Sequence, residues 1–313
     1  MTRTPVGGQR PTDLPAAAFL ALTQSLFDHE GRPVPFVLRG KGEVQDDPFD
    51  THVADILEHA LPPELRVLRA GKPLVSPDIV LARPEEYRLL ESGGADFDTR
   101  SIVAIEVKKV SPDKKTGLPA RGSGMDYNST PPCETVRLYS PRNEEILVPS
   151  FYFFSLLGQT GRGGEVYVES MALVAGSALS KDSDLYDRIT GRRKKAIGLG
   201  TYGDGADRQR PMLVFANPLG WPWMQRQATL ISERDDLDEE FPDLAYIRSM
   251  TRSWKSSEGM EDKEERFHCY RVAALDSSVE EPARDPFPTP RKRTEQTAQR
   301  GRFKIDLSDD SIF

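Results

Sequence analysis

Two stretches near the N-terminus repeat apolar positions at the spacing of an α-helix. The first covers residues 17–29, and the second covers residues 48–61. In the second stretch, one helical face collects Phe49, Val53, Ile56, Leu57 and Ala60. Pro48 suits the first turn of such a helix, and Pro62 with Pro63 would end it. We therefore expect a helix in each stretch.

Further along the chain the spacing of apolar residues changes to that of β-strands. Residues 74–82 and 101–110 are short apolar runs rich in β-branched side chains, with a polar, glycine-containing segment between them. Further apolar segments, expected to form more strands and one or two helices, are residues 135–139, 151–157, 166–176 and 211–221. Strands and helices that alternate in this way predict an α/β or α+β architecture.

The domain organisation follows from changes in composition. Residues 1–35 are expected to form an N-terminal arm and helix, with residues 1–16 as the loose part. Residues 36–275 would form the core of the protein. Residues 276–313 are rich in charge and proline and poor in apolar side chains, which predicts a polar C-terminal tail.

Composition excludes several classes of protein. A chain of 313 residues with 37% hydrophobic content can bury a sizeable core. The longest apolar run is much too short to cross a bilayer, and the N-terminus lacks the apolar region of a secretory signal. Two cysteines make neither a disulfide framework nor a zinc site. These features predict a cytoplasmic protein without a membrane partner.

The net charge of −7 limits how this chain could bind nucleic acid. A protein that coats DNA without sequence preference is usually basic, so binding here would need a local basic surface. Net charge steers association and does not exclude such a surface.

Candidate chemistry lies on the two predicted strands. Asp78 follows a proline on the first, and Glu106 and Lys108 lie two residues apart on the second. Side chains alternate between the faces of a strand, so Glu106 and Lys108 share a face while Val107 points the other way. If the two strands pair, Asp78 can lie beside Glu106.

Two carboxylates placed this way suit a hard cation such as Mg²⁺, which takes carboxylate, carbonyl and water oxygens. We expect Asp78 and Glu106 to hold the metal, with the Val107 carbonyl as a further ligand. The metal would polarise a phosphodiester and activate a bound water. Lys108 would orient or deprotonate that water, or stabilise charge on the phosphoryl group. The alternative is an ion pair of purely structural value on an edge strand.

The pattern of Pro77–Asp78 followed by Glu106–Val107–Lys108 resembles the PD-(D/E)XK nuclease superfamily, and most of all its type II restriction endonucleases. The resemblance covers about residues 36–110. It implies a restriction-endonuclease-like α/β core, with a central mixed β-sheet flanked by helices, and a Mg²⁺-dependent, site-specific endonuclease for double-stranded DNA. It also implies a homodimer, because palindromic DNA matches two-fold protein symmetry.

In that superfamily a helix before the motif often carries another acidic residue after an aromatic one. Phe49–Asp50 is similar, although the family more often has Glu. Asp50 is therefore a candidate accessory acid. Its alternative role is to offset the helix dipole at the N-terminus of the helix.

Three segments are candidates for the DNA-binding surface, because arginine and lysine contact phosphates and base edges. The first follows the predicted catalytic strand and offers Lys109, Lys114, Lys115, Arg121, Asp126, Tyr127 and Asn128. The second offers Arg188, Arg192, Arg193, Lys194, Lys195, Arg208 and Arg210. The third, residues 291–304 in the tail, is better explained as solvated surface. The acidic run 233–243 is expected to be a solvated loop or helix that faces away from DNA.

The leading hypothesis is a restriction enzyme of a restriction-modification system. One alternative keeps the same metal site in a non-specific or repair-type nuclease. The other is a DNA-binding module without catalysis, in which the acids are structural. The long polar segment after Lys108 favours an enzyme that recognises base sequence.

Overall fold

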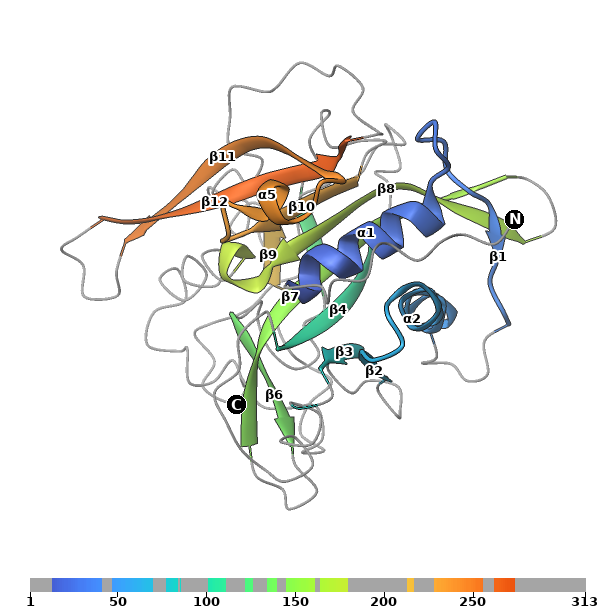
Figure 1. Cartoon of the computed structure of the whole chain (residues 1–313), viewed down its shortest axis with the longest axis horizontal. Helices are drawn as coiled ribbons and strands as arrows, with labels where there is room; N and C mark the ends of the chain where they lie inside the picture. The colour runs from blue at the N-terminus through green and yellow to red at the C-terminus, as the bar shows by residue number, and fades with distance from the viewer. Residues whose placement is uncertain are drawn as a thin grey trace, which may run out of the picture.

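A ten-stranded β-sheet forms the centre of the molecule (Figure 1). The computed structural model describes residues 13–40, 47–69, 77–83, 85, 101–110, 122–125, 134–139, 145–160, 164–179, 213–216, 228–255 and 262–273. Along the sheet the strands follow the order β11-β12-β10-β8-β7-β4-β3-β2, and β1 and β6 pair with β8 and β7 outside this path. The bounds of these strands are β1 Phe36–Val37, β2 Arg66–Arg69, β3 Ile79–Ala82, β4 Ile102–Val110, β6 Thr135–Tyr139, β7 Glu145–Gln159, β8 Glu165–Ala175, β10 Ala228–Ser232, β11 Leu244–Lys255 and β12 Asp262–Val272.

The sheet is mixed, as the family resemblance implies. Strand β4 runs parallel to β7, and β8 runs parallel to β10. The other neighbours on the path, including β2–β3, β3–β4 and β7–β8, are antiparallel. A separate two-stranded sheet pairs β5 (Gly122–Met125) with β9 (Leu213–Ala216).

Helix α1 (Leu14–Leu26) begins earlier than the apolar spacing predicts. Asp13 is its N-cap, and the Asp13 carboxylate accepts a hydrogen bond from the main-chain N–H of Ala16 at 2.9 Å. Pro15 then fits the first turn, where no N–H is needed. Residues 14–16, assigned to a loose arm from sequence alone, are thus part of the helix, where the Asp13 cap and Pro15 start it and Leu14 and Ala16 are buried in the core.

Helix α2 (Pro48–Ala60) corresponds closely to the second predicted helix. Asp47 caps it and accepts a hydrogen bond from the main-chain N–H of Phe49 at 3.0 Å. Helix α5 (Leu237–Glu240) is a single turn after β10.

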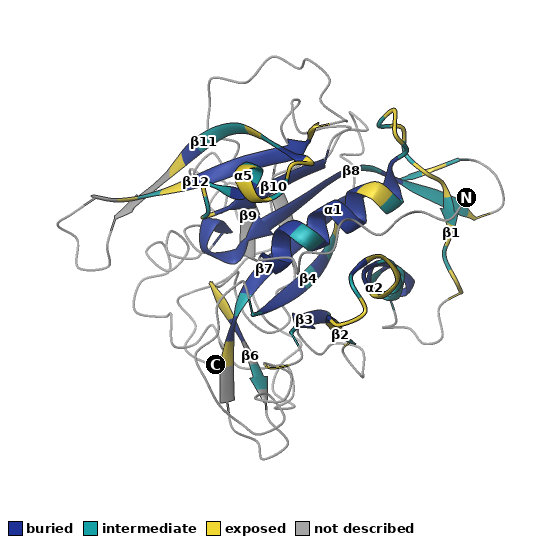
Figure 2. Ribbon diagram, in the orientation of Figure 1, coloured by how far each residue is buried: buried dark blue, intermediate teal, exposed yellow. Residues whose placement is uncertain are grey.

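Helices α1 and α2 pack on one face of the sheet, and the largest core cluster lies between them and the strands. Figure 2 shows this buried layer along α1, β7 and β8. Strand β4 contributes alternate residues to it, namely Val103, Ile105 and Val107. Ile102 and Ala104 belong to a smaller cluster on the other face, which includes Val136 of β6. This alternation places Glu106 and Lys108 on the face opposite Val103, Ile105 and Val107.

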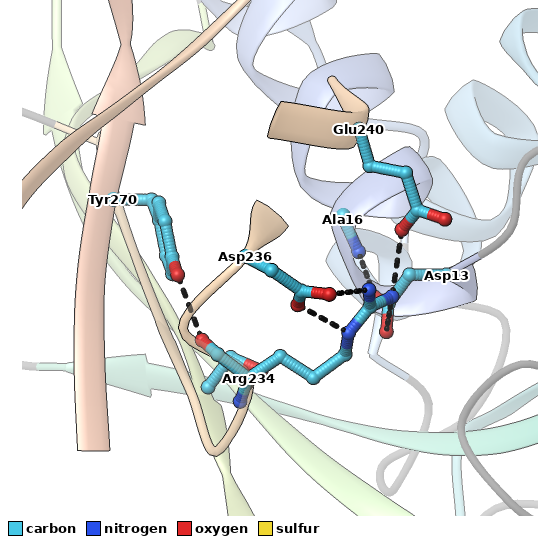
Figure 3. Close-up of polar contacts among 7 residues, drawn as sticks. Asp13, Ala16, Arg234, Asp236, Glu240 and Tyr270 are labelled. Atoms are coloured by element: carbon cyan, nitrogen blue, oxygen red, sulfur yellow. Dashed lines mark hydrogen bonds and ion pairs between the residues drawn. The ribbon is translucent and has the colours of Figure 1, made fainter. Parts of the chain in front are cut away.

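A partly buried ionic cluster joins the start of α1 to the segment after β10 (Figure 3). The Arg234 guanidinium contacts Asp236 and Glu240, each at 2.7 Å, and lies 3.6 Å from the Asp13 carboxylate. The Tyr270 hydroxyl donates a hydrogen bond to the Arg234 carbonyl at 2.8 Å. Part of the acidic run 233–243 therefore balances one arginine, in addition to facing solvent.

Within the part of the chain that the structure describes, no helix is long and apolar enough to cross a membrane. The predicted C-terminal tail, residues 276–313, lies outside the described residues.

Candidate active site

Asp78 and Glu106 face each other across two neighbouring strands. Strands β3 and β4 are antiparallel and pair Ile79 with Ile105. Continuing this register by one position places Asp78 opposite Glu106. Asp78 itself directly precedes β3, and the charge of Glu106 raises the pKa of Asp78, so the two carboxyl groups lie close together.

The backbone of β4 fixes the position of Asp78. Its Oδ2 atom accepts a hydrogen bond from the main-chain N–H of Val107 at 2.7 Å. In a β-strand the N–H and C=O of one residue point toward the same neighbouring strand. The Val107 carbonyl is therefore directed to the side of β4 on which Asp78 lies, as a metal ligand in this position would require.

Lys108 lies on the same face as Glu106 and forms an ion pair with it. Its Nζ atom is 2.6 Å from Glu106 Oε1, and the two side chains are 20% and 15% exposed. The pair is thus mostly withdrawn from water but still open to it on one side. A group with this exposure can be reached by a ligand and is little screened by salt.

Asp50 brings a third carboxylate to the same region. It lies in the first turn of α2, one turn after the cap Asp47. The charges of Glu106 and Lys108 both act on Asp50, as do those of Asp47 and Lys109. Phe49 fixes this end of the helix by stacking on Phe153 of β7, with ring centroids 6.3 Å apart.

Crowded carboxylates change the proton affinities of the site. Burial, followed by the charges of Glu106 and Asp50, raises the pKa of Asp78 well above its usual range. Burial and then the charge of Asp47 raise the pKa of Asp50 to about 7. Burial opposes the charge on Lys108, but Glu106, Asp78 and Asp50 outweigh this effect and raise its pKa. Lys108 is therefore held as a cation, which favours an electrostatic role over that of a proton acceptor.

The donor groups fit a magnesium ion. The negative charges of Glu106 and Asp50 raise the pKa of Asp78, and a divalent cation would supply the positive charge that this region lacks. Among the described residues, no group of three His, Cys, Asp or Glu side chains lies close enough together to hold a metal. A cation here would rest on Asp78, Glu106 and the Val107 carbonyl, with water completing its shell, and Mg²⁺ commonly binds in this way.

Lys109 points away from Lys108, toward the helices. It forms an ion pair with Asp47, the capping residue of α2. Nothing in the sequence pattern assigned a role to Asp47, although an Asp before a proline at a helix start is typical of an N-cap. The partnership with Lys109 depends on tertiary packing and has no local sequence signal.

The other predicted DNA-binding residues lie outside the described part of the chain. These are Lys114, Lys115, Arg121, Asp126, Tyr127, Asn128, Arg188, Arg192, Arg193, Lys194, Lys195, Arg208 and Arg210.

Comparisons with known proteins add little. No protein-family model matches the chain, and no curated protein matches it. A solved structure of the restriction endonuclease BglI, bound to its DNA recognition sequence, is similar to 64% of this chain over 78% of its own. The sequence identity is 11% and the TM-score is 0.26. A likeness this weak carries no argument about fold or function, so the case for a function rests on the geometry of the site.

Proposed function

We propose that this chain is a Mg²⁺-dependent endonuclease that hydrolyses phosphodiester bonds in double-stranded DNA. The observation that carries the proposal is the meeting of Asp78, Glu106 and Lys108 at the β3–β4 pair, with one carboxylate fixed by the Val107 amide. The resemblance to type II restriction endonucleases makes the finer proposal a site-specific enzyme that acts as a homodimer.

Each side chain then has a defined task. Asp78 and Glu106 hold the metal, together with the Val107 carbonyl, and the bound metal supplies a Lewis acid that activates water. Lys108 is a fixed cation beside Glu106, so it offsets the negative charge that grows on the phosphoryl oxygens in the transition state. Asp50, nearby on α2, adds negative potential that favours cation binding.

The geometry favours this function over a module that only binds DNA. A structural role for these groups would be served best by full burial and complete neutralisation. Here carboxylates are packed together with one lysine, and the Lys108–Glu106 pair remains partly exposed. Groups with strongly perturbed pKa values in such places mark functional sites more often than structural ones.

Incubation of a plasmid with the protein and Mg²⁺ tests the proposal directly. Discrete fragments are expected from a site-specific enzyme, whereas a smear would indicate a nuclease without sequence specificity. Asp78→Asn is the matched control, since asparagine can still accept the Val107 hydrogen bond but loses the charge. Intact DNA with wild-type protein, across a range of DNA substrates, would overturn the proposed function.

A further inference from the structure

Asp47 uses its two carboxylate oxygens for different purposes. Oδ1 accepts the Phe49 N–H that caps helix α2, at 3.0 Å. Oδ2 contacts the ammonium group of Lys109 on strand β4. One side chain therefore joins the first turn of the helix to the strand that carries the candidate active site.

The residues that this contact joins are next to the site on both sides. Lys109 directly follows Lys108 in β4. Asp50 lies three residues after Asp47, and positions three apart on a helix share a face. A change in how α2 meets β4 would therefore move the Asp50 carboxylate relative to Glu106 and Lys108.

We infer that Asp47 and Lys109 are positioning residues, whose ion pair holds the first turn of α2, and with it Asp50, at the active end of strand β4. This inference rests on the proposed function. The pair is 28% exposed at Asp47 and 38% at Lys109, so it contributes little to overall stability. The ion pair instead matters for geometry, because it positions Asp50, whose charge acts on the site.

Two variants that change the charge in opposite directions can distinguish this inference from a long-range electrostatic effect. Asp47→Asn removes a negative charge, and Lys109→Met removes a positive one. Acting through space, the first would weaken Mg²⁺ binding and the second would strengthen it. If the ion pair instead acts by holding α2 in place, both variants should weaken Mg²⁺ binding. Asparagine is also a good N-cap, so Asp47→Asn breaks the ion pair while keeping the helix start.

The experiment measures kcat and KM for DNA cleavage, and Mg²⁺ affinity by calorimetry without DNA. The set is wild type, Asp47→Asn, Lys109→Met, their double variant, and each ion-pair variant combined with Asp50→Asn. Both single variants should lower kcat by about 10-fold and weaken Mg²⁺ binding, as changes around a metal's direct ligands commonly do. The double variant should be no worse than either single one. With Asp50 already replaced, breaking the ion pair should cost nothing further.

Lys109→Arg keeps the ion pair and should restore kcat, and circular dichroism melts establish that each variant folds. Opposite shifts in Mg²⁺ affinity for the two single variants would overturn the inference in favour of simple electrostatics. A raised KM that persists in the Asp50→Asn background would overturn the inference and would indicate that Lys109 contacts DNA directly. Unchanged kcat and affinity would also overturn it. If the wild type binds Mg²⁺ but cleaves no DNA, the proposed function fails, while the comparison of Mg²⁺ affinities still tests the role of the ion pair. A wild type that neither binds Mg²⁺ nor cleaves DNA would overturn both the proposed function and this inference.

Discussion

The carboxylate of Asp78 accepts its hydrogen bond from the amide of Val107, the residue between Glu106 and Lys108. This bond sets the spacing of the site, because it ties a side chain at the start of β3 to the backbone of β4. The bond needs an oxygen acceptor but no charge. Charge and geometry at Asp78 can therefore be separated by substitution.

Asp78→Asn and Glu106→Gln should each lower the rate of DNA cleavage in Mg²⁺ by more than about 100-fold, a loss that even changes around a metal's direct ligands can reach. The thermal midpoint should stay close to that of wild type, since neither change removes a buried apolar group. Single-turnover cleavage and a melt measured by circular dichroism check both expectations. Cleavage by either variant at near the wild-type rate would exclude that residue from the proposed metal site.

Lys108→Met keeps the aliphatic stem and removes the cation. We expect kcat to fall by roughly 10²–10³-fold, the loss seen when a group that stabilises transition-state charge is deleted. DNA affinity in Ca²⁺, measured by anisotropy, should change little, because the group acts mainly in the transition state. A variant that lost affinity and kept kcat would show that Lys108 binds ground-state DNA instead.

The buried cap Asp13 gives stability a pH dependence. Burial raises the pKa of Asp13 to about 6, although its bond to Ala16 and the charge of Arg234 oppose the shift. The folded protein therefore holds this proton more tightly than the unfolded chain does. The resulting contribution to stability is present below the usual aspartate pKa and is lost as the pH rises through about 6.

Asp13→Asn should remove this dependence while keeping an N-cap. The free energy of unfolding of the variant, relative to wild type, should rise between about pH 4 and pH 6, by at most about 3 kcal/mol for a shift of this size. Urea titrations at several pH values measure it. A constant difference between the two proteins across this range would mean that Asp13 does not titrate there.

Phe49 anchors the start of α2 in the core. It is fully buried and stacks on Phe153 and Phe36, with centroids 6.3 Å away in each case. Phe49→Ala should lower the free energy of unfolding by about 3–5 kcal/mol, through lost burial and the cavity left behind. Val37→Ala, at a side chain that is 68% exposed, is the control and should change it by less than about 0.5 kcal/mol. Equal effects at the two positions would contradict this account of the core.

The sequence predicted the elements around the site more fully than the rest of the fold. The alternation in β4 was strong enough to place Glu106 and Lys108 on one face and Val107 on the other, because period-two burial is a local signal. Strand order was not predictable, since the parallel pairing of β4 with β7 joins segments far apart in the chain. The start of α1 was missed, because a capping aspartate followed by proline was given less weight than apolar spacing.

The site itself divides in the same way. Asp78, Glu106 and Lys108 could be named from local pattern, and the β3–β4 register brings them together. The ion pair between Asp47 and Lys109 could not be predicted, because it depends on how α2 packs against β4, and the sequence alone made Lys109 a candidate DNA-binding residue. The high proton affinity of Asp78 and the retained charge of Lys108 likewise depend on burial, which only the assembled fold provides.

The contact between Asp13 and Arg234 also has a consequence for folding during synthesis on the ribosome. Helix α1 packs against α2, β4 and β8 as well as β10, and of these only β10 follows β8 in the chain, directly before Arg234. Until those residues emerge from the ribosome, the cap of α1 lacks its arginine and the part of its apolar surface that packs against β10 stays uncovered. Translation that stalls before β10 would therefore leave apolar surface of α1 exposed, which favours aggregation and binding by chaperones.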